Sequence, residues 1–165
     1  MARSSSTHQS VGPIKRAFSS PKALALGMSI WPPFLGAGIR VQEISPDWRR
    51  VRVSIRSRPW TSNYVGTVFG GTMLSGTDPF WMLILMKNLG SDYIVWDRQV
   101  EGRFRRPGHG HLHVTFDLDQ ATLDEIRAEA DTGERVLRWF NSDVLNADGE
   151  VVVTIRRELY VKRKA

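Results

Sequence analysis

The chain has 165 residues, of which 41% are apolar and 24% are charged, a balance typical of one globular domain. It contains no cysteine, which excludes disulfides, thiolate catalysis and cysteine-ligated metals. The formal net charge of +6 favours anionic partners, among them nucleic acid, membrane surfaces and phosphate-bearing small molecules.

The chain begins with a Ser-rich segment, and its first acidic residue is Glu43. We expect residues 1–12 to be a disordered basic tail, because they offer almost no apolar side chains to bury. We favour a solvated tail on a cytoplasmic protein, and the alternative is a mitochondrial transit peptide. The longest apolar run, Phe80–Met86, is too short to cross a bilayer, so no membrane span is expected.

Residues 13–38 predict an N-terminal helix followed by an apolar cover. Apolar side chains among basic ones in residues 13–30 indicate a short amphipathic helix, with Pro21 as a break or a new start. The segment Trp31-Pro32-Pro33-Phe34 cannot continue a helix, and we interpret it as a rigid cover.

Residues 39–163 predict the main domain, which has two strands, one buried helix and four further strands. The helix Phe80–Leu89 is apolar nearly all round, and a charged helical insert covers Thr122–Ala130. The predicted strands are Ile39–Ile44, Arg49–Arg58, Tyr93–Arg106, His111–Asp119, Arg135–Asn146 and Val151–Arg163. A single buried helix must be covered on most of its sides, and one strongly curved antiparallel sheet does this.

A glycine-rich motif precedes the buried helix. It reads Asn63-Tyr-Val-Gly66-Thr-Val-Phe69-Gly70-Gly71, and Asp78 follows after six residues. The motif resembles the signature of hotdog-fold thioesterases of the phenylacetyl-CoA type, in which Asn precedes His-Gly-Gly and Asp follows at the same spacings. The segment Phe104-Arg105-Arg106-Pro107 is similar to the Phe-x-Arg-Pro segment of that family.

A closer resemblance is to an uncharacterised bacterial branch of the superfamily. Its members similarly have Trp-Pro-Pro near the start, then Asn-x-x-Gly-Thr-x-x-Gly-Gly and Asp-Pro-Phe. The resemblance covers roughly residues 30–162. It implies an α+β hotdog fold, in which a long central helix is wrapped by a curved antiparallel sheet of about six strands.

The resemblance also implies roles for the matching residues. Asp78 stands for the carboxylate that attacks the thioester or activates water, Gly70 and Gly71 for backbone N–H donors, and Asn63 for the group that places the substrate carbonyl. Thioester cleavage builds negative charge on the carbonyl oxygen, which fixed N–H donors stabilise. Phe69 departs from the pattern, because the family has His there and the ring removes one polar contact to the thioester.

The spacing of these residues predicts a homodimer. On one helix, Gly71 and Asp78 would lie about 10.5 Å apart along the axis. One carbonyl group cannot be reached from both positions, because the attacking oxygen and the oxyanion donor must each lie about 3 Å from it. Two antiparallel helices across a two-fold axis satisfy this need, so we expect two composite sites per dimer, with a dimer of dimers as a further option.

Asp78 has a second, structural interpretation. Asp-Pro is a strong helix-start pair, with Asp as N-cap and Pro in the first turn. The helix would then begin at Asp78, and residues 66–76 would form a plain loop. Without the resemblance this interpretation would be preferred.

Several further residues are candidates for substrate contact. The apolar set would suit an apolar or aromatic acyl group, and the basic set would suit the phosphates of coenzyme A. They are Phe69, Phe80, Trp81, Met82 and Phe104, together with Arg103, Arg105 and Arg106.

Two other ligand classes are considered and set aside. His109, His111 and His113 alternate, which would suit a metal, but the strand is expected to begin only near His111, so no metal site is predicted. The six tryptophans are scattered along the chain, which favours core packing over nucleic-acid binding.

The sequence therefore predicts an acyl-CoA thioesterase with no cofactor other than coenzyme A as part of the substrate. The alternative is a non-catalytic hotdog dimer that binds acyl-CoA or acyl chains, which Phe69 favours. A hotdog dehydratase or hydratase ranks third, because it needs a His paired with an acid at the helix.

Overall fold

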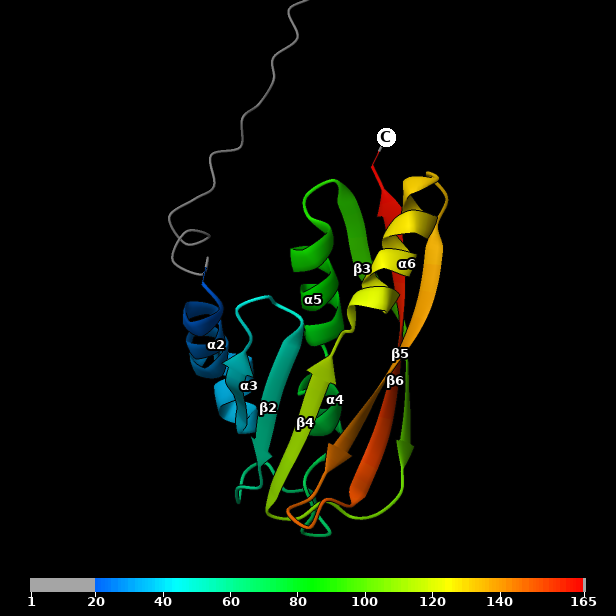
Figure 1. The fold of residues 1–165 in the computed structure, drawn as a ribbon. Coiled ribbons are helices and arrows are strands. Elements are labelled where there is room, and N and C mark those ends of the chain that lie inside the picture. The colour runs from blue at the N-terminus through cyan, green and yellow to red at the C-terminus, as the bar shows by residue number, and fades with distance from the viewer. Residues whose placement is uncertain (1–19, 165) are drawn as a thin grey trace, which may run out of the picture.

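Six strands form one antiparallel sheet in a computed structural model that describes residues 20–164 (Figure 1). Their order across the sheet is β1-β2-β4-β5-β6-β3. The strands are β1 Ile39–Ile44, β2 Arg50–Arg56, β3 Tyr93–Phe104, β4 His111–Asp117, β5 Val136–Leu145 and β6 Val151–Arg163. All six were predicted, and their ends differ from the prediction by no more than two residues.

Two helices, α4 (Gly70–Ser75) and α5 (Phe80–Leu89), lie one after the other against the inner face of the curved sheet (Figure 1). This is the predicted hotdog fold. The central helix is not continuous, however, because the four residues Gly76–Pro79 form a turn between its two parts. Pro79 contributes to the break, since it supplies no backbone N–H and restrains the residue before it.

The sheet is most open between β4 and β5. These strands share one registered pair, His113 with Leu145, whereas β5 and β6 pair along most of their length. Helix α6 (Gln120–Asp131) lies at this opening and packs on β5, β6 and α5. It buries the apolar side chains of Leu123 and Ile126, so the opening is closed by a helix rather than by hydrogen bonds.

The first half of α5 anchors the core. Phe80 and Trp81 are buried, and the indole Nε1 of Trp81 donates a hydrogen bond to Ser142 Oγ at 2.9 Å. The Trp81 ring also stacks on Phe140, with ring centroids 4.4 Å apart. A buried indole N–H needs such a partner, so Ser142 fixes the orientation of the ring. Gly90, with φ of 94°, ends the helix.

Two short helices form the described part of the N-terminal cover. Helix α2 (Pro21–Ile30) begins at the predicted Pro21 start, with Ser20 as its cap, and residues 13–19 of the predicted helix lie outside the described range. As predicted, the segment Trp31–Phe34 does not continue α2, but the two prolines start a new helix, α3 (Pro32–Ala37), which was not expected. Trp31 is extended and breaks the chain between the helices, and prolines fit a first turn, where no backbone N–H is needed.

Helix α2 lies along the outer edge of β1 (Figure 1). Ser29 Oγ accepts a hydrogen bond from the backbone N–H of Val41 at 3.0 Å and lies 3.3 Å from the Val41 carbonyl. The backbone of β1 is therefore tied to α2 at Val41. Among residues 20–164 no helix combines the length and the apolar character that crossing a bilayer requires.

Candidate active site

The loop before α4 is held by the side chain of Asn63. Its Oδ1 accepts hydrogen bonds from the backbone N–H groups of Val65 and Thr67 at 3.1 and 3.0 Å, and its Nδ2 donates to Thr67 Oγ1 at 2.8 Å. An asparagine that bonds its own loop in this way is a turn-forming residue. Asn63 also lines a pocket beside Gly70, so it shapes that pocket from the loop side.

Gly70 and Gly71 begin α4, and two aromatic rings lie against them. A Cβ added to Gly71 would lie 2.4 Å from Phe69 Cε1, and one added to Gly70 would lie 3.1 Å from Phe104 Cζ. The two rings are 58% and 54% exposed, respectively. The backbone N–H groups of Gly70 and Gly71 lie in the first turn of α4, where a helix offers no acceptor of its own. The absence of a Cβ at both positions thus leaves room for the close approach of these rings.

Asp78 lies in the turn between α4 and α5, and it does not cap α5. The N-cap position belongs to Pro79, and no side chain makes a capping hydrogen bond there. The capping interpretation is therefore wrong. Asp78 Oδ1 lies instead 3.1 Å from Nη1 of Arg157, and the aspartate side chain remains 65% exposed. Its carboxylate thus faces solvent on one side and a guanidinium on the other.

Arg157 sits on the inner face of β6, with its side chain only 5% exposed. Its Nη1 also lies 2.9 Å from Asp97 Oδ2 on β3, and its Nη2 donates to the Leu74 carbonyl at 3.2 Å. One guanidinium thus joins the end of α4, the turn and the sheet. We call Asp78, Asp97 and Arg157 the carboxylate–arginine cluster.

Burial raises the pKa of Asp97 above its usual value, and the negative charge of Asp78 adds to this effect. The guanidinium of Arg157 acts in the opposite direction, but burial is the largest cause. Asp97 Oδ1 and Arg157 Nε are buried without a hydrogen-bond partner. Asp97 therefore lies in an unfavourable place for its ionised form, a property common at functional sites.

Two pockets, each of about 440 Å³, border the two halves of the predicted site. The first, the glycine pocket, lies beside Asn63, Gly70 and Phe104. The second, the aspartate pocket, lies beside Asp78 and Arg157. The two pockets share no lining residue, so within one chain Gly70 and the Asp78 carboxylate border separate cavities.

The aspartate pocket has mainly apolar walls from three parts of the chain. Trp31 and Pro33 come from the N-terminal cover, Leu74 from α4 and Val100 from β3. The N-terminal cover therefore borders the carboxylate that the motif singles out.

The other predicted contact residues are divided between core, pocket and surface. Phe80 and Trp81 are buried in the core and line neither pocket, and Met82 packs against that core. Phe69 lies on Gly71, and Phe104 lines the glycine pocket.

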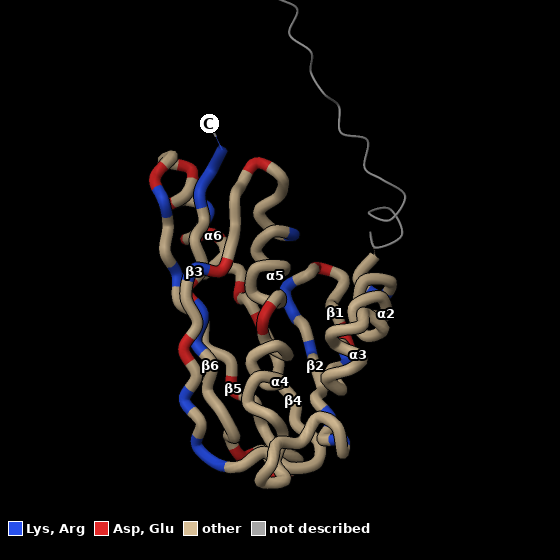
Figure 2. Tube along the Cα trace, turned by 180° about the vertical axis from the view of Figure 1, so that it is seen from behind, with Lys and Arg blue, Asp and Glu red and all other residues tan. Residues whose placement is uncertain are grey.

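The basic residues Arg103, Arg105 and Arg106 lie where β3 leads into the loop before β4 (Figure 2). Arg105 and Arg106 line the glycine pocket, and Arg103 is exposed on β3. Arg106 forms an ion pair with Glu150, and the Nε of Arg105 donates to Thr154 Oγ1 at 3.2 Å. Arg103 and Arg105 are thus the more available guanidinium groups.

The strand β4 begins at His111, as predicted. His113 follows it on the same strand, and His109 precedes the strand. In the described part of the chain, no group of three or more His, Asp or Glu side chains is placed to hold a metal ion.

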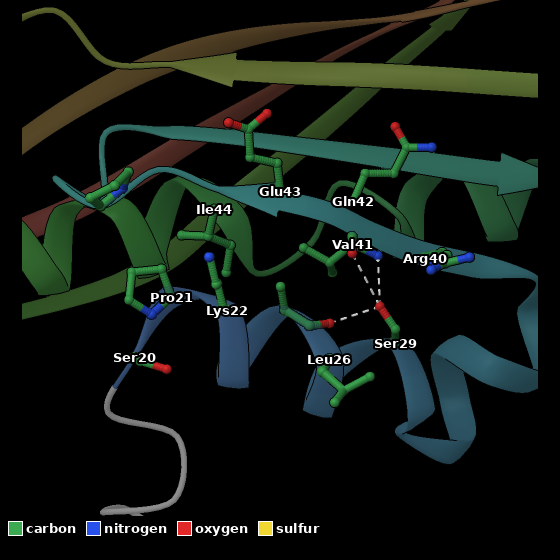
Figure 3. A pocket seen from close by; sticks show the side chains of 12 residues that line it. Ser20, Pro21, Lys22, Leu26, Ser29, Arg40, Val41, Gln42, Glu43 and Ile44 are labelled. Carbon is green, nitrogen blue, oxygen red and sulfur yellow. Dashed lines mark hydrogen bonds between the residues drawn. The ribbon is translucent and has the colours of Figure 1, made fainter.

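A larger cavity than these two, about 670 Å³, lies elsewhere, between α2 and β1 (Figure 3). Lys22 and Leu26 contribute from the helix, and Arg40 and Ile44 from the strand. It shares no residue with the glycine pocket or the aspartate pocket, and its only acid, Glu43, pairs with Arg52 at 2.8 Å. Size alone therefore does not make it the site, because the cavity lacks the motif residues.

Sequence reasoning missed Arg157, Asp97 and the contribution of Trp31 to a pocket wall. A signal for Arg157 was present, because β6 alternates and its inward positions are Val153, Ile155, Leu159 and Val161. An arginine in that apolar series needs a buried partner. The sequence does not say which acid provides it.

Comparisons with known proteins agree with this architecture. Residues 21–161 match the family described as "Domain of unknown function (DUF4442)". No curated protein sequence matches the chain.

Three solved structures share the fold at low identity. A protein of unknown function and probable thioesterase from Pseudomonas aeruginosa, PA5026, has 19% identity and a TM-score of 0.77, over 87% of this chain and 97% of that one. The thioesterase HI1161 from Haemophilus influenzae has 12% identity and a TM-score of 0.63, over 87% and 91%. OLEI01261 from Chlorobaculum tepidum, of unknown function, has 9% identity and a TM-score of 0.69, over 88% and 98%.

Proposed function

The chain belongs to the DUF4442 family and has the hotdog fold, and from this premise we propose that it is a thioesterase that hydrolyses acyl-CoA with an apolar or aromatic acyl group. The observation that carries the proposal is the state of Asp78. Its carboxylate is free of any capping bond, partly exposed, and set beside a mainly apolar pocket. Two of the solved relatives are named as thioesterase or probable thioesterase, which supports the reaction class.

In the proposed reaction, Asp78 acts as the base or as the nucleophile. As a base, it takes a proton from water while the water oxygen bonds to the thioester carbon. The carbon–sulfur bond then breaks, and the thiolate leaves and is protonated. The N–H groups of Gly70 and Gly71 would stabilise the negative charge on the carbonyl oxygen.

A homodimer would bring these groups together. Strand β3 is at the end of the sheet order, and it carries Phe104 of the glycine pocket and Val100 of the aspartate pocket. Antiparallel pairing of two β3 strands across a two-fold axis would bring the glycine pocket of one protomer towards the aspartate pocket of its partner. An open strand edge favours such pairing.

The proposal is tested with purified protein and a panel of acyl-CoA thioesters, by following release of free thiol. Asp78→Asn should lower kcat at least 100-fold, the lower end of what a positioned acid or base contributes. Asp47→Asn, in a distant turn, is the matched control and should keep the wild-type rate. Hydrolysis that is insensitive to Asp78→Asn would exclude this mechanism.

The proposed coenzyme A contact has its own readout. Arg103→Gln and Arg105→Gln should raise KM for acyl-CoA, because their guanidinium groups would bind phosphate. They should leave KM unchanged for N-acetylcysteamine thioesters of the same acyl group, which have no phosphate. An equal effect on both substrates would contradict the contact.

A second candidate function is a non-catalytic dimer that binds acyl-CoA or acyl chains. Phe69 favours it, because its ring lies on Gly71 at the position where the related signature has His. Binding of acyl-CoA in calorimetry without thiol release would support this alternative, and turnover would exclude it.

A further inference from the structure

The side chain of Arg157 is an exception on the inner face of β6. Its neighbours on that face, Ile155 and Leu159, are buried apolar residues, and the paired positions on β3 and β5 are Val100 and Phe140. An apolar residue would fill this position without the cost of burying a charge. The arginine therefore needs an explanation beyond core packing.

Neutralisation of Arg157 requires one acid, and Asp97 supplies it at 2.9 Å. Asp78 is a second acid on the same guanidinium, and its side chain is exposed enough to be solvated without help. The contact between Asp78 and Arg157 thus exceeds what charge balance demands. Two carboxylates on one arginine also raise the cost of ionising Asp97.

The turn itself suggests what the second contact does. An Asp before Pro at a helix start tends to fold back as an N-cap. Here the Asp78 carboxylate pairs with Arg157 instead of capping α5. The same guanidinium also donates to the Leu74 carbonyl, which restrains its position relative to α4. Two hydrogen bonds, to Asp97 and to the Leu74 carbonyl, and the ion pair with Asp78 fix its fork, which suits arginine and not lysine.

We propose that Arg157 is a positioning residue that holds the Asp78 carboxylate at the mouth of the aspartate pocket, and that Asp97 in turn holds Arg157. The catalytic part of this proposal rests on the proposed thioesterase function. Its structural part, the anchoring of the turn Gly76–Pro79 to the sheet, is independent of any activity.

Hydrogen exchange tests the anchoring. The backbone N–H groups of Gly76, Thr77 and Asp78 bond to carbonyls within α4. Arg157→Lys and Asp97→Asn should speed exchange in this turn at least 10-fold, with no change in the paired centre of β5. The matched control is Arg50→Lys, whose partner Asp117 lies on the adjacent strand β4, and it should leave the turn unchanged. Unchanged exchange in the turn of Arg157→Lys would overturn the proposal.

Kinetics test the link to Asp78. Arg157→Lys should lower kcat at least 10-fold and change KM less than twofold, and it should have no further effect in an Asp78→Asn background. A merely structural defect would instead lower kcat by the same factor in the wild-type and Asp78→Asn backgrounds, and that result would overturn the positioning role. If the wild-type protein hydrolyses no thioester, the proposed function fails, and the exchange experiment alone decides the anchoring.

Discussion

Asp47 and Asp78 each lie beside a proline in a turn, yet they are held by opposite means. Asp47, between β1 and β2, accepts hydrogen bonds from Ser45 Oγ at 2.5 Å and from the backbone N–H of Arg49 at 3.2 Å. These partners lie within two residues, and they lower the pKa of Asp47 to about 2. Asp78 has no such local partner, and its ion pair comes from a distant strand.

The Asp47 carboxylate stabilises its own turn, whereas the Asp78 carboxylate is held by a distant strand and remains available to a ligand. The turn at Asp47 supplies hydrogen-bond donors to the Asp47 carboxylate, which leaves that carboxylate little capacity to bind another ligand. The carboxylate–arginine cluster instead concentrates charge where burial already raises the pKa of Asp97. A strained polar group in a pocket is the better candidate for chemistry.

The largest expected effect comes from removing the arginine. Arg157→Leu leaves Asp97 partly buried without its cation, so the free energy of unfolding at pH 7 should fall by about 3 kcal/mol. Urea denaturation followed by circular dichroism measures it. Arg50→Leu, which removes an exposed pair with Asp117, should cost under about 1 kcal/mol. Equal losses in the two variants would contradict the comparison.

A smaller effect is expected from Gly76, which begins the turn before Asp78. A Cβ there would lie 2.7 Å from Cδ1 of Ile55, which is fully buried. Gly76→Ala should therefore destabilise the protein by about 1–2 kcal/mol. Gly36, in α3, is the matched control, because a Cβ added there would have no atom within 4 Å. Gly36→Ala should raise the free energy of unfolding by about 0.5 kcal/mol. Thermal unfolding of both variants would show whether the turn is packed into the core.

The smallest effect belongs to Asp47 and depends on pH. Because its folded pKa is lowered from 3.8 to about 2, its contribution to stability is present above pH 3.8 and is lost as the pH falls through 2. Asp47→Asn should cost under about 1 kcal/mol at pH 7, since the side chain is exposed. Denaturation at pH 7 and pH 2.5 should show the cost shrinking, whereas a constant cost would exclude this origin.

The contrast between local and distant partners also explains which features could be predicted from the sequence. The six strands and the turn at Asp47 follow from alternation and from Ser-Pro-Asp, which are local signals. The motif from Asn63 to Asp78 identifies the site segment, and its resemblance implies one long helix, whereas the Asp-Pro pair favours a new helix start, which is what α5 shows. The contact of Asp78 with Arg157 could not be predicted, because the two residues are brought together only by the sheet.

The predicted apolar wall shows a second limit. Phe80 and Trp81 were predicted to suit an apolar or aromatic acyl group, yet both are buried in the core. Trp31, far from the motif in sequence, lines the aspartate pocket instead. Closeness in sequence to Asp78 is therefore a poor guide to which side chains line its pocket, because a helix begins between Asp78 and these residues.

The hydroxyl of Ser29 has a consequence for how copies of this molecule can add to one another. It accepts from the amide of Val41 on the first strand in the sheet order, donates to the Ala25 carbonyl at 2.7 Å, and so ties α2 to the border of the sheet. A strand that added at this border would first have to displace α2, whereas the proposed dimer uses the opposite border, β3. With α2 in place, strand-to-strand growth from the proposed dimer would end with two copies instead of continuing into a fibre.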